Sequence, residues 1–362
     1  MRHPKAFFLQ KVYKIFPVSF HKYHKTSIMK KALVFCFAIG CLQLVQAQGN
    51  SGYKVTKTFH IASGGGWDYI AADPNSNKLY VSHGGQVNIL DKKTGDSLGV
   101  ILNTTGVHGV AFNQALGKGY TSNGRLNTVS VFDLATAKVT GQIATGQNPD
   151  AIMYDAFSNK IITCNGRSLD LSVIDAATNT VVATIPVGGK PETAVSNNAG
   201  KIYVNIEDKN EIAVVDLATN QVTARWPLGA ESPTGLEIDN ATHRLFAGCD
   251  KMLVVLNADN GKVVARPVIS DGCDGIGFDA QRKLIFASCG QDGVMSVIKE
   301  QSADKLVSYA NVPTKKGART IAVDATTHMV YMPTADFQPQ PAGAKGWPSM
   351  VPGSFQVLVA EK

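Results

Sequence analysis

The chain has 362 residues and a formal net charge of +7 at neutral pH. The excess positive charge lies at its start, because residues 1–47 contain eight Lys or Arg side chains and no acidic ones, whereas the remainder has 27 basic and 28 acidic side chains. A nearly neutral main part argues against a protein that binds nucleic acid or an anionic membrane through a broad positive surface.

Residues 1–47 have the features of an export signal rather than of a folded domain. Residues 29–31 (Met-Lys-Lys) form a charged start, residues 32–40 are apolar, and Val45-Gln46-Ala47 provides a small-residue cleavage site. We therefore expect residues 1–28 to be an over-predicted extension, residues 29–47 to be a signal peptide and residues 48–362 to form the mature protein.

This leader predicts a mature protein in the periplasm or outside the cell. A lipoprotein cut before Cys41 is the weaker alternative, because Ala38 fits the lipid-attachment pattern poorly and the apolar residues continue past Cys41. The apolar stretch is too short for a comfortable membrane span, so we expect no stable span after processing.

A short segment that ends in an acidic or amide residue recurs seven times after residue 47. Its last residues are 40, 42, 42, 42, 40 and 45 positions apart. The copies are WDYIAAD (67–73), VHGVAFN (107–113), PDAIMYD (149–155), PETAVSN (191–197), PTGLEID (233–239), CDGIGFD (273–279) and ARTIAVD (318–324). A fixed period of this length, with about four strand-like runs in each copy, predicts an all-β, seven-bladed β-propeller.

The two ends of the repeat region are uneven. The last repeat stops after its third strand-like run at residues 355–359, and an extra run at residues 55–59 precedes the first repeat. We expect these two runs to pair, because this closes the ring and leaves no long sheet edge unpaired.

Several repeated blocks carry a resemblance to a known family. The YVSH and YVNI strands, the VVDLATNQVTARWPLG and VIDAATNTVVATIPVG blocks and the period of about 42 residues resemble the secreted bacterial YVTN-repeat propellers, the YncE-like family. The resemblance covers residues 52–362. It implies a seven-bladed propeller exported across the inner membrane, and it implies no particular reaction, since the shared residues build blades and turns.

In a propeller blade, the start of the inner strand and the end of the second strand lie on one face, around the mouth of the central channel. The alignment therefore predicts two rings of side chains. The inner-strand ring contains Asp68, His108, Asp150, Glu192, Thr234, Asp274 and Arg319, and the second-strand ring contains His83, Asn123, Asn165, Ile206, Cys249, Cys289 and Thr334. We expect a ligand to bind through Asp68, His108, Asp150, Glu192, Asp274, Arg319, His83, Asn123 and Asn165.

Oxygen-rich clusters suit hard cations such as calcium, and a carboxylate with an amide or a histidine suits a catalytic divalent ion such as zinc. The candidate ligands of such an ion are Asp150, Glu192, Asn123 and Asn165, and the candidate catalytic residues are His108 and Glu192. The alternative is a solvated rim, in which Arg319 balances the neighbouring acids.

The longest loop of the mature chain, residues 333–353, is expected on the same face. It contains Pro339, Pro341, Pro348, Pro352 and the aromatic residue Trp347. Long loops often serve binding. The alternative is a stiff insertion that shields the closure of the ring.

Four cysteines follow the leader: Cys164, Cys249, Cys273 and Cys289. In the sixth repeat, the predicted hairpin pairs Phe278 with Leu284, and the same register places Cys273 opposite Cys289. We expect a disulfide between these two cysteines in an oxidising compartment, in preference to a Cys249–Cys273 pair or free thiols.

These observations favour a secreted binding or scaffold module for an unknown small molecule or protein. A second hypothesis is a lactonase or lyase, in which a divalent ion polarises a carbonyl and His108 acts as general base. A third is a platform for proteins or single-stranded nucleic acid, for which a thin basic patch is available at Lys315, Lys316, Arg319 and Lys345. The sequence contains neither a C-x-x-C-H haem run nor a Gly-x-Ser-x-Gly elbow, so those two chemistries lack their signatures.

Overall fold

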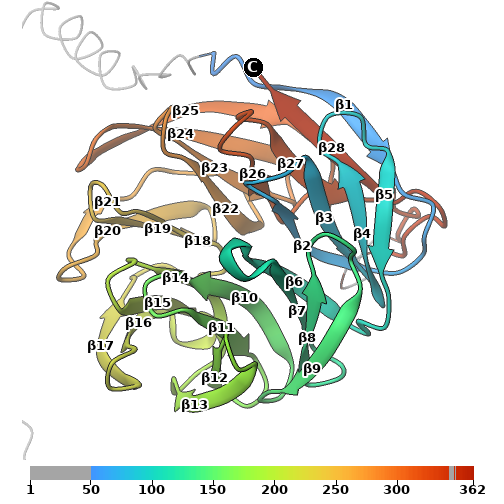
Figure 1. Ribbon diagram of the computed structural model, residues 1–362. Helices are drawn as coiled ribbons and strands as arrows, with labels where there is room; N and C mark the ends of the chain where they lie inside the picture. Colours follow the sequence, from blue (N-terminus) through green and yellow to red (C-terminus); the bar gives the residue numbers. More distant parts are fainter. Residues whose placement is uncertain (1–49, 342–345, 347) are drawn as a thin grey trace, which may run out of the picture. The chain divides into compact units, whose positions relative to one another are not determined.

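Seven four-stranded antiparallel sheets form the blades of a ring, so the predicted seven-bladed β-propeller is confirmed (Figure 1). The computed structural model describes residues 50–341, 346 and 348–362, which belong to one unit spanning Gln48–Lys362. The predicted leader, including Cys41, lies outside the described residues. The described part also contains two short 3-10 helices, η1 (Gln114–Leu116) and η2 (Glu207–Lys209), and no helix in it is long and apolar enough to span a membrane.

Six blades consist of four strands that follow one another along the chain. Blades one to three are β2 (Trp67–Ala72), β3 (Lys78–His83), β4 (Gln86–Asp91) and β5 (Ser97–Ile101); β6 (Val107–Asn113), β7 (Lys118–Asn123), β8 (Thr128–Asp133) and β9 (Val139–Ala144); β10 (Pro149–Asp155), β11 (Lys160–Asn165), β12 (Asp170–Asp175) and β13 (Thr180–Pro186). Blades four to six are β14 (Pro191–Ser196), β15 (Lys201–Ile206), β16 (Glu211–Asp216) and β17 (Gln221–Pro227); β18 (Leu236–Asp239), β19 (Arg244–Cys249), β20 (Met252–Asn257) and β21 (Val263–Ala265); β22 (Cys273–Asp279), β23 (Leu284–Cys289), β24 (Val294–Ser302) and β25 (Lys305–Pro313).

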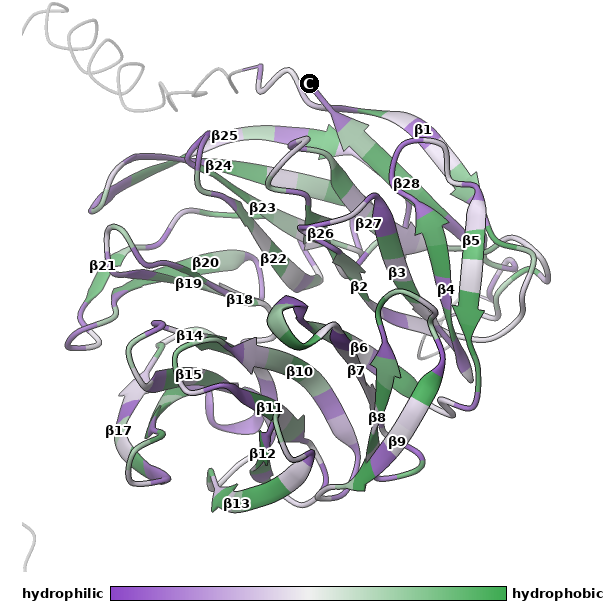
Figure 2. Ribbon diagram, in the orientation of Figure 1, coloured by the Kyte–Doolittle hydropathy of each residue, from purple (hydrophilic) through white to green (hydrophobic). Residues whose placement is uncertain are grey.

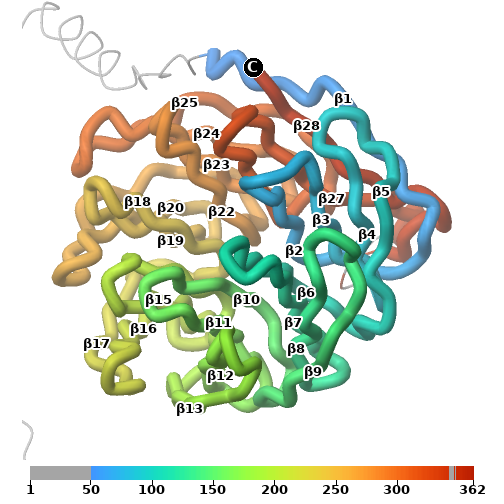
Figure 3. The backbone as a smooth tube through the Cα atoms, viewed as in Figure 1, coloured from blue at the N-terminus to red at the C-terminus, as the bar shows by residue number. Residues whose placement is uncertain are grey.

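Blade seven is built from both ends of the propeller. Its strands are β26 (Ala322–Val323), β27 (Val330–Thr334), β28 (Gln356–Glu361) and β1 (Lys54–His60). Strand β1 pairs antiparallel with β28, with Phe59 opposite Val357, and Figure 3 shows the first strand running beside the end of the chain. The extra strand β1 therefore closes the ring as predicted, and it covers the edge of β28 that would otherwise be unpaired.

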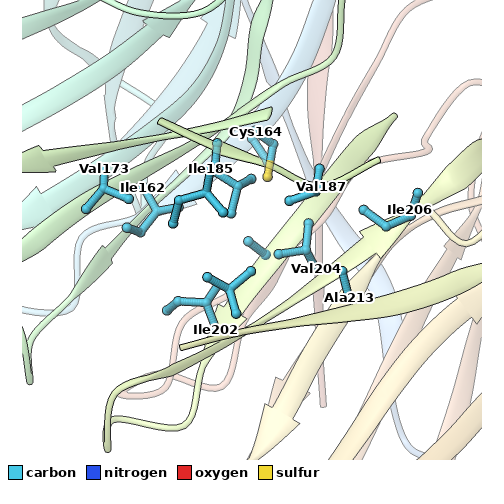
Figure 4. Packing of buried hydrophobic residues seen from close by; sticks show 13 residues of the cluster. Ile162, Cys164, Val173, Ile185, Val187, Ile202, Val204, Ile206 and Ala213 are labelled. Carbon is cyan, nitrogen blue, oxygen red and sulfur yellow. The ribbon is translucent and has the colours of Figure 1, made fainter. Parts of the chain in front are cut away.

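The core lies between neighbouring blades. The second and third strands of most blades are buried along nearly their whole length, whereas the outermost strand β17 alternates between exposed and partly buried positions. Figure 4 shows one such layer, in which Ile162 and Val173 of blade three pack with Val204 of blade four, and Figure 2 shows hydrophilic residues in many connecting loops. Removing this apolar surface from water is the main stabilising contribution to such a repeat stack.

Candidate functional site at the channel mouth

Each inner strand of blades one to four begins with an irregularity in its pairing. In β2 the register against β3 shifts between Trp67 and Ile70, and β6, β10 and β14 shift at the equivalent points. A β-bulge leaves a residue unpaired and redirects its side chain. The four shifts contain members of the inner-strand ring: Asp68, His108, Asp150 and Glu192.

Hydroxyl groups of the second strands hold the backbone of these irregular segments. The Oγ atom of Ser122 accepts a hydrogen bond from the amide of Gly109 at 2.9 Å and donates to the carbonyl oxygen of Asp150 at 2.5 Å. In the same way, Ser82 accepts from the amide of Asp68 at 3.1 Å. These buried hydroxyls position the site residues without taking part in the site.

A row of charged contacts joins four blades at the mouth. The Nδ1 atom of His108 lies 2.5 Å from Oδ2 of Asp68. On the other side, Nη2 of Arg319 lies 3.3 Å from Oδ1 of Asp68, and Nη1 of Arg319 donates to Oδ2 of Asp274. The guanidinium also donates to the carbonyl oxygen of Trp67 at 3.0 Å. Arg319 therefore links the first and sixth blades across the closure of the ring.

Asp150 lies on the other flank of His108. Its Oδ1 atom is 3.4 Å from Nδ1 of His108, an ion-pair distance without hydrogen-bond geometry. Asp150 is only 8% exposed, and this buried oxygen has no hydrogen-bond partner among the described residues. An unsatisfied buried oxygen is unfavourable by about 1–3 kcal/mol, so a cation at this position would stabilise it.

Asp68, His108 and Asp150 meet the distance requirement for one metal ion. One ligand atom from each of the three side chains lies within 4.8 Å of the other two. Metal ligands lie about 2.0–2.4 Å from the ion, so three atoms at this spacing can share one cation with small adjustments.

Glu192 belongs to a neighbouring pair of contacts rather than to this triad. Its Oε2 atom lies 3.0 Å from Nζ of Lys190, and the same ammonium donates to Oε2 of Glu207. Lys190 is a site residue that the sequence reasoning missed. Its position directly before the fourth inner strand, two residues from Glu192, was the available signal.

Two acids of the cluster, Asp150 and Glu192, have pKa values well above the ordinary range. Burial raises the pKa of Asp150 to about 7, and repulsion from Asp68 adds to the effect. Burial likewise raises the pKa of Glu192 to about 8, with repulsion from Asp150 as the second cause. Burial lowers the pKa of His108, but the hydrogen bond with Asp68 and the surrounding negative charges outweigh it, so the pKa is raised.

The charges at the mouth do not balance when every acid is ionised. Asp68, Asp150, Glu192 and Asp274 contribute four negative charges, and the permanent cations in contact with them are Arg319 and Lys190. The cluster can gain the missing positive charge by protonation of His108, Asp150 or Glu192, or by binding a cation.

The second-strand ring lies at the same end of the blades, where His83 pairs with Trp67 and Asn123 with Val107, but its side chains are buried. All seven of its members are 0% exposed: His83, Asn123, Asn165, Ile206, Cys249, Cys289 and Thr334. The side chain of Asn123 donates to Ser130 at 2.9 Å and accepts from Thr121 at 2.9 Å. Such contacts within a blade occupy the groups that a ligand would need.

Asn165 repeats this arrangement in blade three, where its amide donates to Asp170 at 2.7 Å and accepts from Thr163 at 3.0 Å. In the predicted metal-binding set of Asp150, Glu192, Asn123 and Asn165, the two amides therefore already make hydrogen bonds within their own blades. In blades one and two the residue before the ring member, Ser82 or Ser122, is the one that contacts the inner strand.

His83 is also a structural residue. Its ring stacks on Phe355 with the centroids 3.8 Å apart, and its two nitrogens contact Oγ of Ser63 at 2.7 Å and the carbonyl oxygen of Gly65 at 2.9 Å. Burial lowers the pKa of His83, which keeps the imidazole neutral near pH 7.

Tyr69 is a second residue that the sequence reasoning missed. It follows Asp68 on β2, and its hydroxyl reaches Oγ1 of Thr193 in blade four at 3.5 Å. Burial raises its pKa well above the ordinary value, with the charges of Glu192 and Asp150 as further causes. The neutral phenol thus crosses the channel next to the acids. No local sequence pattern could have shown a contact between blades one and four.

The long loop contributes an aromatic side chain to the mouth. Phe337 pairs with Met350 across the loop, and its ring centroid lies 6.1 Å from that of Trp67. The Oδ1 atom of Asp336 on the same loop lies 2.5 Å from Nζ of Lys315. Trp347 and Lys345 lie outside the described residues, so their predicted roles stay predictions.

Cys273 and Cys289 face each other on β22 and β23, and all four cysteines of the described residues are present as thiols. The predicted register was nevertheless wrong for most of the hairpin, because Phe278 pairs with Ile285 rather than with Leu284. A shift between Cys273 and Gly275 restores the cysteine pairing. The disulfide between them stays a prediction.

Thr234 of the inner-strand ring and Cys164 both make contacts that stabilise the fold. Thr234 donates to the carbonyl oxygen of Cys273 at 2.8 Å. Cys164 is buried in the apolar layer between blades three and four (Figure 4).

Comparisons with known proteins identify the fold. No family profile matches the sequence, and a search of curated proteins gives no significant match. Among solved structures, the chain is similar to hydrazine synthase of Kuenenia stuttgartiensis, with a TM-score of 0.65 and 15% sequence identity over 75% of this chain and 94% of the other. At this identity the similarity shows the propeller fold and gives no specific function.

Proposed function

We propose that this chain is a ligand-binding module whose binding centre is a divalent cation held by Asp68, His108 and Asp150 at the channel mouth. The observation that carries the proposal is the buried Oδ1 of Asp150, which accepts no hydrogen bond, on a side chain that shares a group of three ligand atoms within 4.8 Å with Asp68 and His108. The excess of acidic over permanently cationic side chains in the cluster supports the same conclusion. The rigid ring keeps these side chains in place, so binding requires little additional ordering.

The donor set favours a particular class of cation. An imidazole nitrogen with two carboxylates suits Zn²⁺ or Mn²⁺, whereas Ca²⁺ takes six to eight oxygen ligands. Three protein ligands also leave coordination positions open, which is the arrangement of a site that binds a further molecule.

Calorimetric titration of the purified mature protein with Zn²⁺, Mn²⁺ and Ca²⁺ tests this proposal. We expect one ion per chain, and at least tenfold weaker binding for Asp150→Asn. Asp216→Asn is the matched control, since Asp216 accepts hydrogen bonds in an exposed turn, and it should bind as the wild type does. Wild-type protein that takes up none of the three ions would refute the proposal.

A second candidate function is a metal-assisted lactonase or lyase. The observation in its favour is the Asp68–His108 pair. In this alternative His108 is a base and not a ligand of the cation, because a carboxylate on Nδ1 orients the imidazole and leaves Nε2 available for proton transfer. Hydrolysis of a simple lactone, followed in a pH-stat with and without Zn²⁺, tests it. The activity must disappear in His108→Ala and decline in Glu192→Ala, and wild-type protein without activity on any lactone tried would argue for binding alone.

We also propose that the chain is an exported member of the YVTN-repeat, YncE-like propellers. The repeated YVSH and YVNI strands and the leader support this assignment. Expression in a Gram-negative host, followed by fractionation and N-terminal sequencing, should give a periplasmic or external protein that starts at Gln48. Recovery of the uncut chain in the cytoplasm would contradict it, and a lipid-modified Cys41 would show the lipoprotein alternative.

A further inference from the structure

A small pocket adjoins the charged cluster on the side of blade seven. Its volume is about 200 Å³, and its lining residues are Gly66, Trp67, Gly317, Arg319 and Phe337. Two aromatic rings belong to this lining, with the plane of Trp67 inclined by 46° to that of Phe337. The pocket is therefore apolar on one side and bordered by a guanidinium on the other.

The pocket and the cation centre share their boundary. Trp67 precedes Asp68 in β2, so one residue lines the pocket and the next contributes to the cation centre. Arg319 lies between the two, 3.0 Å from the Trp67 carbonyl oxygen and 3.3 Å from Oδ1 of Asp68. The two places are thus neighbours, with the guanidinium of Arg319 at their common border.

We propose that the ligand is a small carboxylate with one compact apolar group. This inference rests on the cation centre of the proposed function: the carboxylate binds the open positions of the cation, and the apolar group packs in the pocket against the rings of Trp67 and Phe337. The pocket is smaller than the roughly 300–1,000 Å³ typical of drug-sized ligands. It suits a single ring or a branched alkyl group and is too small for a nucleotide or an oligosaccharide.

Two glycines of the loop before β2 allow the pocket to be filled without disturbing the fold. A Cβ atom added at Gly66 or at Gly64 meets no other atom within 4 Å, and neither residue has a positive φ. Gly66 lines the pocket and Gly64 does not. Gly66→Val is therefore a pocket-filling variant, and Gly64→Val is its control.

Benzoate, cyclohexanecarboxylate and acetate serve as probes, titrated by calorimetry into protein saturated with Zn²⁺ or Mn²⁺. We expect the two ring carboxylates to bind at least tenfold more tightly than acetate. In Gly66→Val this preference should disappear while the affinity for the metal alone stays within twofold of the wild type, and Gly64→Val should keep both.

The outcomes separate this inference from the proposed function. Metal binding without a preference for ring carboxylates, or a preference that survives in Gly66→Val, overturns the pocket assignment and leaves the cation centre in place. Failure of the wild type to bind any of the metals overturns the cation centre, and the ligand inference with it.

Discussion

Nδ1 of His108 lies 2.5 Å from Oδ2 of Asp68, although the two residues are 40 positions apart and belong to different blades. Both side chains are displaced from regular strand pairing by the irregular starts of β2 and β6. The contact therefore exists because two repeats place equivalent residues side by side around one channel. It is the centre of the charged row that continues through Arg319 to Asp274.

Asp68→Asn should remove the charge that both His108 and Arg319 contact. We expect the pKa of His108 to fall, because its hydrogen-bonded anion is lost, and the free energy of unfolding to decrease by about 1–3 kcal/mol. NMR titration of the His108 ring and chemical denaturation provide the two measurements. Asp96→Asn, in an exposed turn, should change neither; an unaltered His108 pKa in Asp68→Asn would contradict the assigned contact.

The stability of the metal-free protein should depend on pH with a defined sign. The folded-state pKa values of Asp150 and Glu192 lie above their ordinary values of 3.8 and 4.5, so the native state holds more protons than the unfolded chain. Their contribution is complete at low pH and is lost as the pH rises through the folded values. The Tm should accordingly fall between about pH 5 and pH 8.

Glu192→Gln should reduce this slope, because it removes one of the two shifted groups. Adding the divalent cation should raise the Tm most above pH 7, where the carboxylates of the site have lost their protons. Thermal denaturation across the pH range measures both effects. A Tm that rises steadily from pH 5 to pH 8 without metal would show that these acids are ionised at little cost.

Ser122→Ala should destabilise the protein through the start of two inner strands. The hydroxyl is buried, and its loss leaves the amide of Gly109 and the carbonyl oxygen of Asp150 without this partner. We expect a loss of about 1–3 kcal/mol and weaker metal binding, because the backbone that carries Asp150 is released. Thr94→Ala, in an exposed turn, is the control for loss of a hydroxyl; an equal effect of both would show that the strand starts do not depend on Ser122.

Phe59→Ala should weaken the closure of the ring. Phe59 is 5% exposed and packs in the core between blades seven and one. Deleting a buried aromatic ring reduces the free energy of unfolding by about 3–5 kcal/mol. Denaturant unfolding gives the value, and size-exclusion chromatography should show self-association if β1 detaches and exposes the edge of β28. His60→Ala, on an exposed position of the same strand, should behave as the wild type.

Oxidation should join Cys273 to Cys289 and leave Cys164 and Cys249 as thiols. The first pair is directly opposed on neighbouring strands, whereas Cys164 lies in another interblade layer. Mass spectrometry of protein from an oxidising compartment should show the loss of two hydrogens and one cross-linked peptide. Alkylation of all four thiols under denaturing, non-reducing conditions would rule the bond out.

The repeat pattern was sufficient to predict the number of blades and the closing role of the first strand. Each repeat of about 42 residues contains the turn residues and the apolar pattern of its own blade, so the blades can be recognised one by one from the sequence. The same alignment placed Asp68, His108 and Asp150 in one ring of seven side chains, because ring closure brings equivalent positions of successive repeats together. It named Asp150, Glu192, Asn123 and Asn165 as metal ligands, whereas the three ligand atoms that the structure brings within 4.8 Å belong to Asp68, His108 and Asp150.

Only the tertiary structure decided which of these residues touch and which are available. The side chains of Asn123 and Asn165 make hydrogen bonds within their own blades. Tyr69 crosses the channel, and Phe337 contacts Trp67 from a loop distant in the sequence. A shift of one residue in the pairing decides whether a side chain faces the channel mouth or the inside of a blade. The period of the repeat does not determine the pairing to a single residue. Sequence determines the repeat, but the orientation of each site residue depends on bulges and packing between blades.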